Sequence, residues 1–134
     1  MIKLLTLSVA LIAVAFSAEL HWQKDLNTAL TLAKKEHKNL MIMVESQHCR
    51  WCKKMKYRTL SDEKVIKRLT PYILAKVTRE DKVTMSLLPK AEAAPTIFFM
   101  TEEKKVIESV VGYFIVGDFL SYIDDVEKKY PLKK

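Results

Sequence analysis

Apolar residues recur along this chain at two spacings, which predict alternating helices and strands. Over residues 19–37 they fall three or four positions apart, as on one face of a helix, at Trp22, Leu26, Ala29, Leu30 and Ala33. Continuous apolar runs predict buried strands at 40–44, 72–78 and 96–100. Residues 106–111 follow a polar turn, so we expect them to form the antiparallel partner of the strand at 96–100.

Further helices are predicted between and after these strands. One covers about 49–58, and the next begins at a capping Ser61 and ends at Pro71. A short helix ends near Leu88, and Asp118 caps a last amphipathic helix. A strand–helix–strand unit gives parallel strands, and the hairpin adds antiparallel ones. The pattern therefore predicts an α/β domain with a central mixed sheet and helices on both faces.

The composition narrows the class of partner. The chain has 134 residues, enough for one domain with one core, and a formal net charge of +7. Its cations are spread along predicted helices and turns, without the dense basic and aromatic strip that nucleic-acid binding uses. We therefore expect no nucleic-acid partner and, because no dimerisation segment is evident, a monomer. One cluster is different, because Arg50, Lys53, Lys54 and Lys56 surround a cysteine.

The N-terminal residues have the organisation of a secretory signal peptide. A single lysine precedes an uncharged apolar run over 4–16, and small residues follow. The run is shorter than the ~20 residues that span a membrane, and a retained anchor is the alternative. Cleavage after Ser17 or Ala18 gives a leader over 1–17 and a single domain over 18–134. We expect export to the periplasm, where disulfides form and exchange.

Cys49 and Cys52 are the only cysteines, and they lie between a predicted strand and a predicted helix. The thiolate is the reactive form of cysteine, and a helix N-terminus stabilises it with partial positive charge. With two residues between the cysteines, the second sulfur can reach the first within one helical turn. This spacing favours a redox pair that opens and closes.

Other uses of a Cys-x-x-Cys pair fit this sequence less well. Two cysteines cannot complete a four-cysteine zinc site, and His21, His37 and His48 are scattered. Covalent haem attachment needs a histidine directly after the second cysteine, where this chain has Lys53. A purely structural disulfide would close a very small loop and add little stability. We therefore expect neither a resident metal nor a cofactor.

The chain resembles the thioredoxin-like superfamily in three sequence features, and the resemblance covers essentially the whole predicted domain. They are Cys49-Arg50-Trp51-Cys52 between strand and helix, Ala94-Pro95-Thr96 at the start of a strand, and Gly112 after the hairpin. The run Cys-x-x-Cys-Lys-Lys-Met and the exported context are similar to periplasmic thioredoxin-like proteins, including the sulfur-oxidation-associated thioredoxins. The resemblance implies a thioredoxin-like fold and thiol–disulfide oxidoreductase activity.

The resemblance also implies roles for individual residues. Cys49, at the helix tip, is expected to attack a disulfide, and Cys52, one turn in, to resolve the intermediate. Pro95 in the cis form would expose the backbone of Ala94 to an extended substrate segment; a trans proline is the ordinary alternative at a strand start. Trp51 would contact substrate or pack as a lid on the loop.

Near the pair the sequence departs from thioredoxin itself. Met43 stands where thioredoxin has a buried aspartate, and Lys76 matches the partner lysine of that aspartate. Glu45 lies two residues on, and hence on the same side of the strand. It would accept a proton from Cys52, pair with Lys76, or face solvent.

Positive charge gathers beside the first cysteine. Arg50, Lys53 and a protonated His48 are expected to favour the Cys49 thiolate, as is the helix end. Cations that only solvate the helix would do so less, because exposed charges are screened within about 8–10 Å. The direction of electron flow is therefore open at this point.

By resemblance, we expect a reductant of disulfides in exported proteins or small molecules, supplied with electrons by a membrane partner. An oxidant that introduces disulfides and a non-enzymatic binding module are the alternatives. A Cu(I) carrier would use Cys49, Cys52 and His48, because soft sulfur ligands suit Cu(I). Strand methionines near such a site are more often core filler than ligands; the nearby methionines are Met41, Met43 and Met55.

Overall fold

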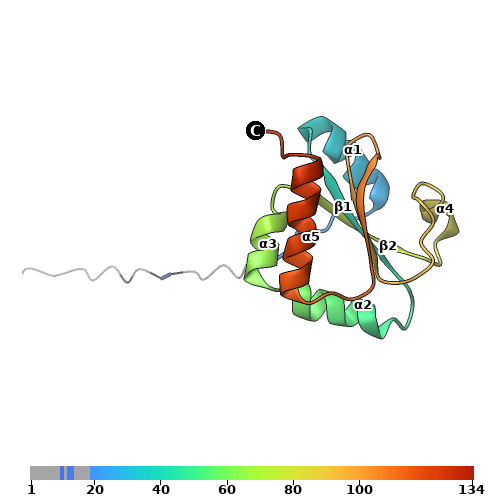
Figure 1. Cartoon of the computed structure of the whole chain (residues 1–134), viewed down its shortest axis with the longest axis horizontal. Helices are drawn as coiled ribbons and strands as arrows, with labels where there is room; N and C mark the ends of the chain where they lie inside the picture. The colour runs from blue at the N-terminus through green and yellow to red at the C-terminus, as the bar shows by residue number, and fades with distance from the viewer. Residues whose placement is uncertain (1–9, 11, 14–18) are drawn as a thin grey trace, which may run out of the picture.

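Four strands and five α-helices form the part of the chain that the computed structural model describes, which is residues 10, 12–13 and 19–134 (Figure 1). The strands are β1 Leu40–Glu45, β2 Ile73–Thr78, β3 Thr96–Met100 and β4 Val106–Val111. The helices are α1 Leu26–Glu36, α2 Arg50–Lys54, α3 Glu63–Leu69, α4 Lys82–Met85 and α5 Val116–Lys129, with a π-helical turn, η1 Met55–Thr59, directly after α2. The predicted leader over 1–17 falls almost wholly outside the described residues. Within the described residues, no helix has the length and apolar character needed to cross a membrane.

The strands form one mixed sheet, as the sequence pattern predicts, and their order in it is β2-β1-β3-β4. β1 pairs in parallel with β2 and antiparallel with β3, and β3 pairs antiparallel with β4. The two inner strands are almost wholly buried because both of their faces are covered, which explains their continuous apolar sequences. β1 is therefore a central strand, and the cysteine pair follows its carboxyl end.

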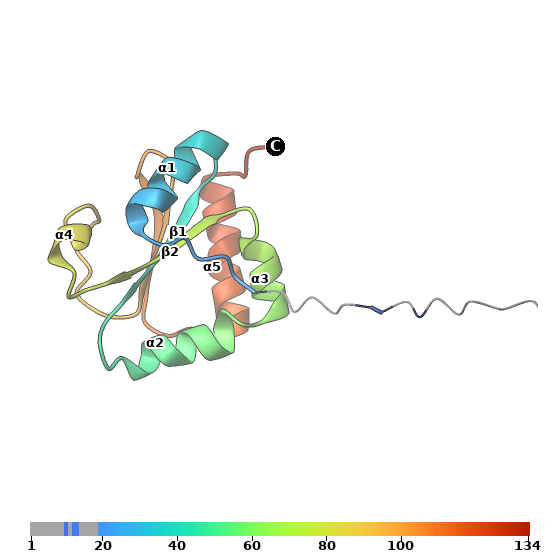
Figure 2. The ribbon, with the colours of Figure 1, turned by 180° about the vertical axis from the view of Figure 1, so that it is seen from behind.

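Helices cover both faces of the sheet and create two separate cores. Figures 1 and 2 show α1 and α5 on opposite faces. Because alternate side chains of a strand point to opposite faces, Met41 and Met43 enter the core beneath α2, α3 and α5, whereas Leu40, Ile42 and Val44 enter the core beneath α1. Both faces of the sheet are thus covered by helices, as predicted for this α/β domain.

The first helix is shorter than the apolar spacing predicts. It begins at Leu26, where the Asp25 side chain accepts the Thr28 N–H at 2.7 Å and caps the helix. The preceding segment is extended: Trp22 forms a parallel bridge with Leu74, and the next residue donates its N–H to the Leu74 carbonyl at 2.8 Å. The prediction of a helix from residue 19 is therefore wrong, because this segment pairs with the edge of β2.

Two predicted helix caps are also wrong. Asp62, and not Ser61, caps α3, because the Asp62 carboxylate accepts the N–H groups of the second and third helical residues. The last helix begins at Val116, so Asp118 lies within its first turn and not at its cap. In both cases the residue type is suited to a helix start, but the backbone turns at a different position.

Candidate active site at the Cys49–Cys52 pair

The two cysteines occupy the junction between β1 and α2. β1 ends at Glu45, the loop over 46–48 follows, and Cys49 caps the N-terminus of α2. His48 takes a left-handed backbone conformation, with φ of 56°, as the chain turns into the helix. The loop is held by a hydrogen bond from the Gln47 N–H to the carboxylate of Glu80 at 3.2 Å.

The sulfurs of Cys49 and Cys52 are joined in a disulfide, with 5.2 Å between the Cα atoms. They differ in depth. Cys49 is half-buried at the helix tip, whereas Cys52 is 2% exposed and packs in the core shared by α2, α3 and α5. The Cys49 sulfur also accepts the Cys52 N–H at 3.1 Å. A negative charge on this sulfur would therefore face a backbone donor as well as the start of the helix.

A second loop forms the other wall beside Cys49. The Ala94–Pro95 peptide bond is cis, as the resemblance implies. The Cys49 sulfur lies 3.7 Å from the carbonyl oxygen of Ala94, which a reduced thiol at this position could use as a hydrogen-bond acceptor. Gly112 has φ of +96°, a conformation that favours glycine, and its N–H donates to the Pro95 carbonyl at 2.8 Å. The three matched segments thus converge at the redox pair.

A pocket of about 160 Å³ opens next to the cysteines, with both Cys49 and Cys52 in its wall. Glu45 lines the same pocket, and its side chain is only 18% exposed. One carboxylate oxygen of Glu45 lies 2.6 Å from Nζ of Lys56, which comes from the turn after α2. The Glu45–Lys56 ion pair and the deeper cysteine, Cys52, therefore line the same small pocket.

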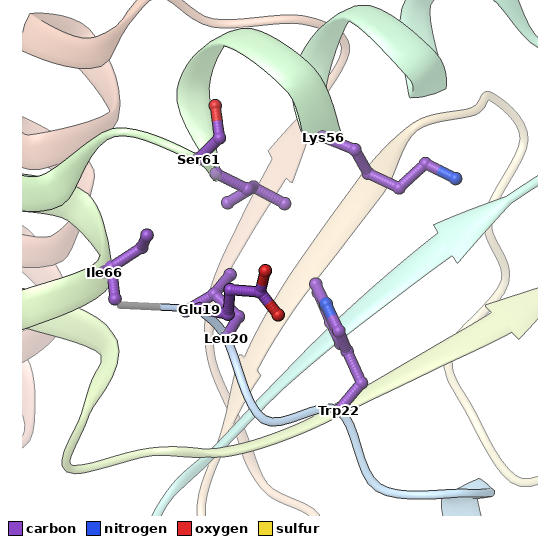
Figure 3. A pocket seen from close by; sticks show the side chains of 7 residues that line it. Glu19, Leu20, Trp22, Lys56, Ser61 and Ile66 are labelled. Carbon is purple, nitrogen blue, oxygen red and sulfur yellow. The ribbon is translucent and has the colours of Figure 1, made fainter. Parts of the chain in front are cut away.

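Lys76 does not join this ion pair. In the sheet it is in register with Met43, and its side chain is exposed, with Nζ 5.1 Å from the centre of the Trp22 ring. Figure 3 shows Trp22 facing the helical segment that carries Lys56, across a pocket of about 390 Å³. The Lys56 amine points away from Ser61 in this view. The structure thus brings Glu45 to Lys56 and leaves Lys76 against an aromatic ring.

Trp51, between the two cysteines in sequence, packs against Tyr113. The two rings are stacked, with centroids 5.8 Å apart and planes 29° apart, and Trp51 is still 44% exposed. Arg50 lies 5.3 Å from the centre of the Trp51 ring, and Lys54 lies 4.7 Å from it and 5.5 Å from the centre of the Tyr113 ring. Among the cationic candidates, Lys53 is exposed and lines the pocket beside the cysteines, as does His48.

The methionines near the pair belong to the core. Met41, Met43 and Met55 are all 0% exposed and pack in the same apolar cluster as Cys52. Over the described part of the chain, no group of three or more His, Cys, Asp or Glu side chains gathers as a metal site would require. Their burial leaves these three thioethers no open side toward a surface ion.

Sequence reasoning assigned no site role to two residues that complete this geometry. Lys56 was one member of a cationic cluster, and its signal is its position one helical turn after Cys52, which brings it to the same side of the helix. Tyr113 follows Gly112 directly and so lies beside the site once the hairpin has formed. The Trp51–Tyr113 contact joins segments distant in sequence, and the Lys56–Glu45 ion pair depends on how the helix packs on the preceding strand, so spacing alone reveals neither partner.

An accessible sulfur at a helix tip, joined to a buried sulfur one turn in, defines the class of thiol–disulfide oxidoreductases on this α/β scaffold. The sequence comparison gives the same result: residues 26–127 match the family model described as a thioredoxin-like domain. The chain belongs to that family. No curated protein matches the sequence.

Solved structures share the fold at low identity. A thioredoxin from Thermus thermophilus is 23% identical with a TM-score of 0.67, and the match covers 83% of this chain and 88% of that one. The DsbH oxidoreductase is 18% identical with a TM-score of 0.68, covering 87% and 88% of the two chains. The periplasmic thioredoxin SoxS from Paracoccus pantotrophus is 13% identical with a TM-score of 0.56, covering 69% and 98%. At these identities the similarity establishes the thioredoxin-like fold.

Proposed function

We propose that this protein is exported to the periplasm and reduces disulfides of exported proteins or small molecules there. The observation that carries the chemistry is the difference in depth between the sulfurs, because Cys52 is 2% exposed behind a half-buried Cys49. Only the outer sulfur can meet a bulky disulfide, and the inner one can attack it from within the protein. The leader-like sequence over 1–17 and the similarity to a thioredoxin described as periplasmic support the location.

The reaction balances as two exchanges. The Cys49 thiolate attacks one substrate sulfur, so that a bond to Cys49 forms, the substrate S–S bond breaks and the first substrate thiolate leaves. Cys52 then gives up its proton and attacks the Cys49 sulfur, which forms the Cys49–Cys52 disulfide and releases the second substrate thiolate to be protonated. Two electrons pass from the cysteine pair to the substrate. A dithiol of a membrane electron-transfer partner would return the pair to the reduced form.

The first step needs an ionised sulfur at Cys49. The Cys52 N–H that the sulfur accepts at 3.1 Å supports a negative charge there, and so do the helix start and the cations Arg50 and Lys53. His48 would add to them when it is protonated. The exposed side chains contribute less than the fixed backbone donor, because solvent screens them.

The second step needs a proton acceptor for Cys52, and we assign this role to Glu45. Its carboxylate lines the pocket that Cys52 lines and is held there by Lys56 at 2.6 Å. Met43, at the position where thioredoxin has its buried aspartate, cannot accept a proton. Glu45 is thus the acidic side chain that shares the pocket with the resolving sulfur.

Reduction of insulin by the purified protein, with a small dithiol as electron donor, tests the proposed function. We expect turnover by the wild type and none by Cys49→Ser or Cys52→Ser, because each variant removes one of the two exchanges. A wild type no faster than Cys49→Ser would overturn the proposal, and tight stoichiometric Cu(I) binding without turnover would indicate a carrier instead. The reduction potential of the cysteine pair then gives the direction of electron flow. We expect a value close to that of thioredoxin, which is about −270 mV, whereas a value of about −120 mV would indicate an oxidant.

A further inference from the structure

Three cations beside Cys49 lack an acidic partner in the described part of the chain. Arg50 and Lys53 are exposed and Lys54 is half-buried. Among residues 19–134 no carboxylate lies within ion-pair distance of any of the three, although eight ion pairs form elsewhere in that range. Glu45, the nearest carboxylate on β1, is engaged by Lys56. Within residues 19–134, the charges of these three cations beside the attacking sulfur are therefore not neutralised by an ion pair.

Two of these cations are held in place by aromatic rings. The Lys54 ammonium lies over both Trp51 and Tyr113, and the Arg50 guanidinium lies over Trp51. A ring face attracts a cation without occupying its N–H donors, so those donors stay free for an oxygen acceptor. Because the side chains are already ordered, binding a carboxylate costs less entropy than it would with free lysine and arginine chains.

Apolar surface lies next to the same cations. Trp51 is 44% exposed, and Val111, which pairs with Thr96 at the strand start after Pro95, is 57% exposed. The Cys49 sulfur lies 3.7 Å from the carbonyl oxygen of Ala94, the residue directly before that proline. A segment that reaches Cys49 therefore meets a tryptophan with two ordered cations on one side and an apolar strand end beside the proline.

We propose that the site selects an extended acidic segment, one that carries carboxylates beside its disulfide cysteine. Arg50 and Lys54 would bind these carboxylates, while Trp51 and Val111 cover an apolar neighbour. Charge complementarity supports this choice, since the cations have no acidic partner among residues 19–134 and the whole chain carries +7. The inference rests on the proposed thiol–disulfide exchange and adds the chemistry of the partner.

Three disulfide peptides that differ only in the residues flanking the cysteine (Glu, Gln or Lys) test this selectivity. The rate constant of the first exchange with the reduced protein is measured in a single turnover, at low salt and at high salt. Two charge contacts at the protein surface predict that the Glu peptide reacts about fivefold faster than the Gln peptide at low salt. The Lys peptide should be the slowest, and high salt should bring the three rates together. Equal rates for the three peptides at low salt would overturn the inference.

The variant Arg50→Gln/Lys54→Gln locates the effect. Its readout is the ratio of the Glu rate to the Gln rate, because any change in Cys49 reactivity affects both peptides and cancels. We expect this ratio to fall to about one, as the charge contacts are lost. Lys105→Gln/Lys128→Gln is the matched control: it removes the same charge from exposed positions in the β3–β4 turn and near the end of α5, and should keep the wild-type ratio.

The outcomes separate the two proposals. A site variant that keeps the wild-type ratio, or a control variant that loses it equally, would contradict recognition by Arg50 and Lys54. A wild type that reduces none of the peptides would instead contradict the proposed exchange activity. Reduction of all three peptides without preference leaves the exchange activity standing and removes only the inference about acidic partners.

Discussion

The two cysteine sulfurs have different surroundings although only two residues separate them. Cys49 caps α2, accepts the Cys52 N–H and touches the Ala94 carbonyl oxygen. The Cys52 sulfur is buried and shares its pocket with Glu45. In the proposed mechanism, the first set of contacts stabilises negative charge on the attacking sulfur, and the second provides an acceptor for the proton that the resolving sulfur must lose. The two sulfurs differ in their contacts because Cys49 lies at the N-terminus of α2 and Cys52 lies one turn further into the helix.

At the residue scale, Glu45→Gln should slow the second exchange and leave the first unchanged. The amide keeps the size of the side chain but cannot take up a proton, so we expect release of the mixed disulfide to fall by about tenfold or more at neutral pH. Quenched single-turnover reactions, analysed by mass spectrometry, give both rates. Glu36→Gln, at an exposed position far along α1, is the control. An unchanged rate of release would show that Glu45 has only a structural role.

The sequence predicted the side of β1 on which Glu45 lies, but not its partner. Alternation along a strand determines which face a side chain takes, and this was sufficient to place Glu45 with Met43. The choice between Lys76 and Lys56 depends on how the helix packs over the sheet end. Lys76 is instead held by Trp22, a residue whose own location was predicted wrongly.

At the scale of elements, the strands were easier to predict than the helix ends. β1 and β3 are buried on both faces, so their apolar runs alone identify them. Trp22 fits the spacing of α1, yet it pairs with Leu74, and no local pattern contains this long-range bridge. The π-helical turn η1 was also absent from the prediction, since its wider turn has no distinct sequence signal.

The start of α3 provides a test at this scale. Asp62→Ala removes the acceptor of two helix N–H groups and should lower the free energy of unfolding by about 1 kcal/mol. Ser61 instead donates to the Tyr57 carbonyl at an exposed position, so Ser61→Ala should change stability by no more than about 0.5 kcal/mol. Urea denaturation followed by circular dichroism measures both variants. A larger loss for Ser61→Ala than for Asp62→Ala would contradict the observed cap.

At the scale of the whole molecule, the alternating order of elements was sufficient to predict a mixed sheet with helices on both faces. That order leaves few ways to bury both faces of β1 and β3. The contacts that join the surfaces of separate elements could not be predicted. One is the ion pair between Glu108 on β4 and Lys129 at the end of α5, with 2.6 Å between the charged atoms.

This ion pair predicts a pH dependence of stability. The hydrogen bond from Lys129 lowers the pKa of the Glu108 carboxyl in the folded protein. Its stabilisation is therefore complete above the ordinary glutamate pKa and is lost as the pH falls through the lowered value. Lys129→Gln should be less stable than the wild type at pH 7 and equally stable in strong acid, as measured by thermal unfolding across pH. Lys128→Gln removes the same charge at a neighbouring exposed position and should show no such pH-dependent difference.

The alkylation rates of the two reduced cysteines test the central claim most directly, because that claim divides the chemistry between an ionised outer sulfur and a shielded inner one. The reduced protein is treated with iodoacetamide at neutral pH, and mass spectrometry of peptides follows each site with time. We expect Cys49 to react faster than an ordinary free thiol and Cys52 to react far more slowly. Equal labelling of both positions, or a Cys49 no faster than a free thiol, would contradict the account.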